Sequence, residues 1–150
     1  MARKLEDKHP GYFEAVLQLR DVLQEVRTYA EDEIIRVRMN VAKAVELKNG
    51  VDYYLSDNSL TRALGKRMQE KFGGYREESA SLWGVKKDRE VYRVTVLFRG
   101  VPFKKGDLVE FAGEDYIVRN VSKDIFLQNV KSGTKVHVTY KDMKQIRKKD

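Results

Sequence analysis

The sequence predicts an α+β protein in which a small α/β layer module precedes an SH3-like β-barrel. Two observations carry this prediction. Up to about residue 99, runs with an apolar residue at every second position alternate with runs of helical spacing. After Gly100, helical spacing disappears until the last few residues, and short strand-like runs separated by turn residues take over. We therefore expect two domains, 10–99 and 101–150.

A strand followed by a basic helix organises the first module. Alternation of apolar and more polar residues over 51–55 predicts a half-buried strand. Asn58 or Ser59 is expected to cap the helix that follows, and Gly73-Gly74 to end it. This helix, 58–72, is predicted by an apolar residue at every fourth position: Leu60, Leu64, Met68 and Phe72.

The remaining elements of the first module are predicted from the same two patterns, apolar residues at every second position for strands and at helical spacing for helices. The alternating run 12–20 predicts a strand, and helical spacing over 21–39 predicts a helix capped by Asp21. Asn49-Gly50 is the preferred pair for a tight two-residue turn, so we expect a hairpin there. Two helices should then cover one face of a mostly antiparallel sheet. A second hairpin is expected, with its strands at 75–85 and 91–98.

The second module is predicted to be a small barrel. Its strand-like runs lie at 108–111, 114–121, 125–129 and 135–140. Four or five short strands in roughly 40 residues cannot build a sandwich, whereas closing one small sheet removes its open edges. The tail beyond residue 140 is expected to add one helical turn and loose positive charge.

Composition and charge narrow the function classes. The 150 residues carry 30 Lys and Arg against 23 Asp and Glu, a net charge of +7, and the pI near 9.5 is typical of nucleic-acid-binding proteins. The absence of cysteine excludes disulfides, thiolate zinc sites and cysteine nucleophiles. The charged N-terminus lacks the apolar run of a signal peptide, and no apolar segment approaches the roughly 18 residues of a membrane span. We expect a soluble cytoplasmic protein without membrane contact.

The sequence offers no arrangement of residues that would form a catalytic or metal site. Neither His9 nor His137 has ligand-like spacing to a second histidine or to a carboxylate pair. Glu31, Asp32 and Glu33 are consecutive, so on a helix they point in different directions and cannot clamp one ion. Nothing supplies a nucleophile with an adjacent base, which disfavours a hydrolase or transferase. We expect no enzyme activity, no cofactor, no metal and no small-molecule substrate.

Basic residues give the stronger functional signal, because cations that converge on one side of a protein neutralise RNA phosphates. Exposed members of Tyr53, Tyr54 and Trp83 could in addition stack on unpaired bases. The alternative is scattered solubilising charge, partly paired with nearby acids. The nucleic-acid-binding candidates come from the basic helix and its exit, a loop, the module junction and a later hairpin: Arg62, Lys66, Arg67, Lys71, Arg76, Lys86, Lys87, Lys104, Lys105, Lys131 and Lys135.

Four segments carry a family resemblance: HPGYFEAVLQLR, NGVDYYLSDNSLTRALGKRMQEKFGG, VYRVTVLFR and FKKGDLVEF. Together they resemble the middle region of the large-ribosomal-subunit nuclear export adaptor family, the nonsense-mediated mRNA decay protein three family, in its archaeal type. The resemblance implies a ribosomal-protein-like α+β module followed by a domain similar to the first half of translation factor 5A, an SH3-like barrel. The family's cysteine-rich zinc module has no counterpart in this sequence, as expected of an excised middle portion or a short natural relative.

The resemblance implies a non-catalytic adaptor in ribosome biogenesis. Its partner would be the large ribosomal subunit, through ribosomal RNA near the exit-tRNA site and a stalk ribosomal protein beside it, and we expect a monomer. Helix 58–72 and the barrel loops would then contact RNA phosphates. The alternative function is a protein-interaction adaptor whose SH3-like barrel recruits a protein partner, since fold alone does not choose between the two.

Overall fold

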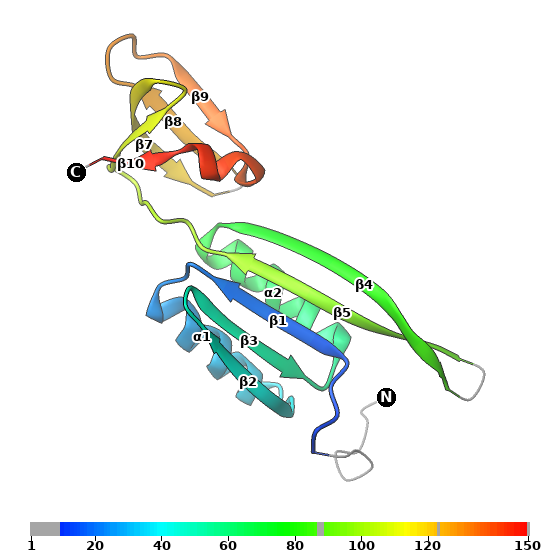
Figure 1. The fold of residues 1–150 in the computed structure, drawn as a ribbon. Coiled ribbons are helices and arrows are strands. Elements are labelled where there is room, and N and C mark those ends of the chain that lie inside the picture. The colour runs from blue at the N-terminus through cyan, green and yellow to red at the C-terminus, as the bar shows by residue number, and fades with distance from the viewer. Residues whose placement is uncertain (1–9, 87–88, 123, 150) are drawn as a thin grey trace.

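The computed structural model describes residues 10–86, 89–122 and 124–149. Within these residues the chain forms two sheets of five strands each, and both α-helices accompany the first sheet (Figure 1). The mixed α/β class is therefore confirmed. The first sheet and its helices comprise β1 (Ala15–Arg20), α1 (Gln24–Arg36), β2 (Val41–Leu47), β3 (Gly50–Leu55), α2 (Asn58–Phe72), β4 (Tyr75–Lys86) and β5 (Arg89–Arg99).

Strand β1 lies at the centre of the first sheet, whose strand order is β2-β3-β1-β5-β4. It pairs antiparallel with β3 and parallel with β5, so that Ala15 lies between Leu55 and Val94. The other strand pairs of this sheet are antiparallel, as predicted. Both helices lie behind the sheet, against one face (Figure 1). The core between sheet and helices includes fully buried Leu17, Leu19 and Leu64.

Helix α2 has the predicted bounds but not the predicted cap. The Leu60 N–H donates to the Asp57 carboxylate at 2.8 Å, so the cap precedes both candidates, Asn58 and Ser59. The Asn58 N–H donates to the Glu14 carboxylate, also at 2.8 Å. Two carboxylates therefore satisfy free amides of the first turn, where the helix dipole favours negative charge. Gly73, at φ 70°, ends the helix.

Helix α1 is shorter than the predicted 21–39, and Asp21 does not cap it. Asp21 has a φ of 53°, and its carboxylate accepts a hydrogen bond from Arg99 at 2.7 Å. Leu23 occupies the capping position without a side-chain hydrogen bond. The connection from β1 therefore consumes three residues before the helix begins. Strand β1 also begins at Ala15, later than predicted, because the chain changes direction around Glu14.

The hairpin between β2 and β3 forms where Asn49-Gly50 predicts it, but the turn lies one residue earlier. Lys48 and Asn49 form the turn, and Gly50 is the first residue of β3, paired with Leu47. The glycine is needed for another reason. A Cβ atom at Gly50 would lie 1.8 Å from the carbonyl oxygen of Leu19, because β1 passes directly beside it.

The second sheet is open, so the barrel closure predicted from the sequence is wrong. Its order is β10-β6-β7-β8-β9, and β10 and β9 are its two edges. The predicted strand positions agree closely with the structure, and the predicted helical turn is a 3-10 helix, η2. The elements are β6 (Leu108–Phe111), β7 (Glu114–Val121), β8 (Ile125–Asn129), β9 (Lys135–Val138), η2 (Tyr140–Gln145) and β10 (Arg147–Lys148).

A buried phenol connects β3 to α1 in the first module. The Tyr53 hydroxyl donates to the Glu31 carboxylate, which also accepts from the Arg27 guanidinium at 3.2 Å. Arg27 additionally pairs with Glu46 on β2. Burial, reinforced by the hydrogen bond to Glu31, raises the pKa of Tyr53 above its ordinary value. The phenol therefore stays neutral throughout the physiological range.

We expect Gly50→Ala to lower the free energy of unfolding by about 2 kcal/mol or more, because the new methyl group must displace the β1 backbone. Urea unfolding followed by circular dichroism measures the change. Gly84→Ala is the matched control: no atom lies within 4 Å of its Cβ position, and its backbone carries no positive φ. Equal midpoints for Gly50→Ala and the unsubstituted chain would contradict the close approach.

We expect Tyr53→Phe to lower the free energy of unfolding by about 1 kcal/mol near neutral pH, because a hydrogen bond to a carboxylate is lost. The folded-state pKa of Tyr53 is raised, so its contribution is complete below about pH 10 and declines as the pH rises beyond that value. The stability gap between the two proteins should therefore narrow in alkaline solution. Urea titrations at pH 8 and pH 11 measure it, and a constant gap would contradict the assignment.

Candidate nucleic-acid interface

Three arginines of the predicted phosphate-binding set are ion-paired within the first module. Arg62 Nε lies 3.5 Å from Glu78 Oε1, and Arg76 contacts the same carboxylate. Arg67 Nε lies 3.1 Å from Glu33 Oε1 and so ties α2 to α1. These guanidinium groups hold the helices and the sheet together, which reduces what they can offer to a phosphate.

The two lysines predicted on α2 remain available. Lys66 is exposed and has no ion pair with any described residue. The Lys71 ammonium lies 5.6 Å from the ring centre of Tyr29 and 5.7 Å from that of Phe72. Helix α2 therefore presents a smaller cationic surface than its sequence predicts.

The remaining candidates lie outside the helix. Lys86 ends β4, with a side chain that is not described, and Lys87 lies outside the described residues. Four lysines are exposed and have no ion pair with a described residue; two lie in the connection between the sheets and two on the β8–β9 hairpin: Lys104, Lys105, Lys131 and Lys135.

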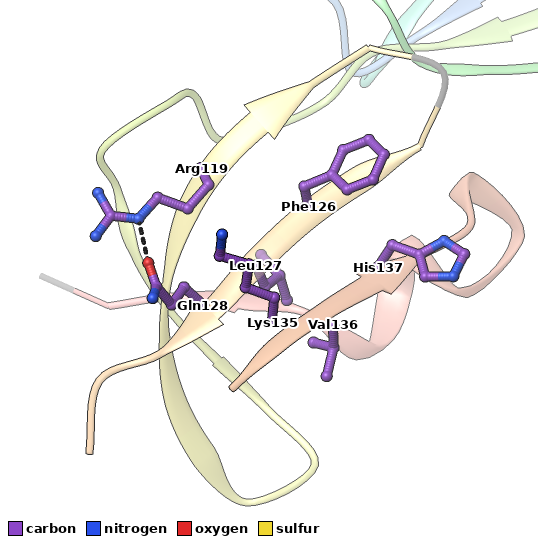
Figure 2. Close-up of a pocket in the computed structure, with 7 residues that line it drawn as sticks. All are labelled: Arg119, Phe126, Leu127, Gln128, Lys135, Val136 and His137. Atoms are coloured by element: carbon purple, nitrogen blue, oxygen red, sulfur yellow. Dashed lines mark hydrogen bonds between the residues drawn. The ribbon is translucent and has the colours of Figure 1, made fainter. Parts of the chain in front are cut away.

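The outer face of the second sheet carries a groove, of whose lining only Lys135 was predicted from the sequence (Figure 2). Its volume is about 370 Å³. Phe126 lies directly opposite His137 in the β8–β9 register, and their rings stack with centres 6.0 Å apart and planes 16° apart. Phe126 is 38% exposed. Lys135 and Arg119 complete the lining with Leu127, Gln128 and Val136.

This groove combines the two features that single-stranded nucleic acids require, planar rings and positive charge. The Arg119 guanidinium donates to the Gln128 amide oxygen at 2.8 Å, which fixes its position beside the groove (Figure 2). Asp124 Oδ2 lies 3.3 Å from His137 Nδ1 and so helps to position this ring. Arg119 was missed in the sequence because it lies beside the irregularity between Val118 and Asn120.

Other chemistry has little support in the described part of the chain. Within it, no three His, Asp or Glu residues group in a way that could hold a metal ion. None of its helices combines the length and apolar character needed to cross a membrane. A second hollow of about 190 Å³ lies where the modules meet, and Lys141, Lys144 and Arg99 contribute to its lining. Positive charge therefore recurs around each described hollow.

Comparison with known families identifies the first module. A family model described as NMD3, second domain, matches residues 12–99, which is more than half of the chain. The chain belongs to the NMD3 family. The matched segment contains the first sheet and both helices, and the predicted membership of the family's middle region is thereby confirmed. NMD3 family members are adaptors associated with the large ribosomal subunit and its assembly and export. No curated protein matches the chain.

The ion pairs predict that adjacent cations on α2 have different roles. Arg67→Gln should lower the free energy of unfolding by about 0.5–1 kcal/mol, because the Glu33 carboxylate loses one of its two arginine partners. Lys66→Gln should change it by less than about 0.3 kcal/mol, since no described residue depends on it. Thermal unfolding of both variants checks this, and an equal loss in both would contradict it.

Proposed function

We propose that this chain is the RNA-binding part of an NMD3-type adaptor and contacts ribosomal RNA of the large subunit near the exit-tRNA site. The observation that carries the proposal is that some of the predicted basic side chains already have ion-pair partners and others do not. Three candidate arginines of the first module, Arg62, Arg67 and Arg76, are paired with internal carboxylates. The four candidate lysines of the junction and of the β8–β9 hairpin have no ion pair with a described residue: Lys104, Lys105, Lys131 and Lys135.

The charge distribution supports the same conclusion. Residues 101–150 carry eleven Lys and Arg against seven Asp and Glu. Unpaired ammonium groups bind phosphate by releasing condensed counterions, so affinity falls steeply with salt. Lysine suits this role because it acts as a point charge without demanding one geometry. The groove around Phe126 adds a planar surface to the same module.

We further propose that residues 10–99 and 101–150 are separate domains and that the second is a partly open barrel of the SH3-like kind. Its last strand, β10, pairs with its first, β6, so the sheet must curve back toward its own beginning. The bulge between Val118 and Asn120 provides the bend. This curvature leaves the β7–β9 face, with its groove, directed outward.

Co-sedimentation with purified large and small ribosomal subunits across a salt series tests the proposal. The chain should bind the large subunit selectively, with affinity that decreases as salt rises. Lys131→Glu with Lys135→Glu should weaken binding about tenfold at moderate salt and reduce the salt slope by about 1–2. The matched control, Arg38→Glu with Lys48→Glu, makes the same charge change on exposed residues of the first module and should have a smaller effect.

Three outcomes would overturn the proposal. Equal binding to both subunits would mean that charge alone is responsible, and equal weakening by the two double variants would mean the same. Absence of binding at low salt would exclude an RNA contact within these residues. Retention of a defined ribosomal protein after complete nuclease digestion would replace RNA binding with the recruitment of a protein partner.

A further inference from the structure

The first sheet carries a row of aromatic rings and cations on the face opposite the helices. The Lys43 ammonium lies 4.4 Å from the ring centre of Tyr54, and the Tyr54 and Phe13 rings meet edge to face at 4.8 Å. The Arg93 guanidinium lies 4.0 Å from the Phe13 ring centre and 3.9 Å from that of Trp83. We call this row the stacking ladder; its members, in spatial order, are Lys43, Tyr54, Phe13, Arg93, Trp83 and Tyr12.

Strand register places the stacking ladder across the sheet. Tyr54 alternates with buried Tyr53 and Leu55, and Arg93 precedes buried Val94, so both ladder residues point away from the helices. Lys43 lies opposite Tyr54 in the β2–β3 pair. The ladder therefore runs from β2 to β4, with Phe13 lying just before the start of β1. At about 4.8 Å per strand spacing, it extends over roughly 19 Å.

Arg93 is the unusual member of the ladder. Its guanidinium lies between two rings, and its Nε is buried without a hydrogen-bond partner. It has no ion pair with any described acid, unlike the arginines of the α2 surface. A guanidinium held in this way has already lost most of its rotational freedom, so binding an anion costs little additional entropy. Of the two rings that hold it, Trp83 is 46% exposed and Phe13 is partly buried.

We propose that the stacking ladder binds single-stranded RNA, with bases stacked on Trp83 and Tyr54 and backbone phosphates at Arg93 and Lys43. Each unpaired nucleotide offers a flat base and a negative charge, which match the combination of rings and cations in the ladder. No acidic residue belongs to the ladder, so charge complementarity favours an anionic ligand. A duplex hides its base faces and does not fit this surface. The inference extends the proposed function by naming unpaired nucleotides as a second RNA target, reached through the opposite module from the lysine hairpin.

The sequence provides a reporter within the ladder, because Trp83 is the only tryptophan of the chain. The full chain is titrated with a 12-nucleotide oligouridine, and in parallel with an RNA duplex of equal length. We expect the oligouridine to quench Trp83 fluorescence in a saturable manner and the duplex to cause little change. Arg93→Lys keeps the charge but loses the planar stack, so it should raise the Kd about tenfold.

A matched pair of ring variants separates the ladder from general surface effects. Tyr54→Leu should raise the Kd for oligouridine about tenfold. Tyr92→Leu removes another ring of the β4–β5 hairpin, which is 43% exposed and alternates with the ladder residue Arg93, and it should leave the Kd unchanged. Circular dichroism establishes that each variant is folded, and Arg93→Lys remains informative if Tyr54→Leu is not.

Several results would overturn the inference. Absence of saturable quenching by oligouridine would do so, as would equal quenching by duplex or equal effects of the two ring variants. Quenching by a polyglutamate peptide in preference to RNA would assign the ladder to an acidic protein partner. None of these results changes the co-sedimentation of the lysine variants, so failure of the ladder and failure of the proposed function are distinguishable.

Discussion

Burial of β1 is the constraint on which the first module depends. Its inward side chains, among them Leu17 and Leu19, are fully buried, and it is hydrogen-bonded on both sides, to β3 and β5. Because neighbouring side chains in a strand alternate between faces, burying one set under the helices leaves the other set on the open face. The stacking ladder is built on this second face. The buried core and the stacking ladder therefore lie on opposite faces of the same strands. A one-residue shift in strand pairing would disturb both.

The spacing of hydrophobic residues was sufficient to predict most helices and strands, because it indicates directly which side chains face the core. Helix α2 was predicted with the observed bounds, and its buried residues Leu64 and Met68 lie on the predicted stripe. The errors concern residues whose role depends on a distant neighbour. Asp21 pairs with Arg99 instead of capping α1, and Gly50 is required by the approach of β1. Closure of the second sheet likewise depends on curvature, which local spacing does not specify.

The candidate site was less predictable than the fold, because a list of basic residues does not say which of them already have partners. Arg67 is engaged by Glu33, which lies far from it in the sequence, so an apparently strong cation is largely structural. The groove around Phe126 and the stacking ladder form only because strand pairing brings their side chains together. Phe126 meets His137 only after β8 and β9 pair, and Arg93 meets Trp83 only after β4 and β5 pair. Composition predicted that the surface is positively charged. The folded topology determines which of the basic side chains are left without an ion-pair partner.

The parallel pairing of β1 with β5 also has a kinetic consequence. Ala15 lies near the start of the chain and pairs with Val94, and no local hairpin can supply this contact. Closing such a long loop costs chain entropy before any native contact offsets it, so topologies of this kind fold slowly. During synthesis, β1 and β3 emerge well before β5, and the backbone N–H and C=O groups on the β5 side of β1 stay unpaired over that interval. The central strand of the first sheet therefore stays exposed on one side until β5 has been made, and the sheet is completed only after residue 99.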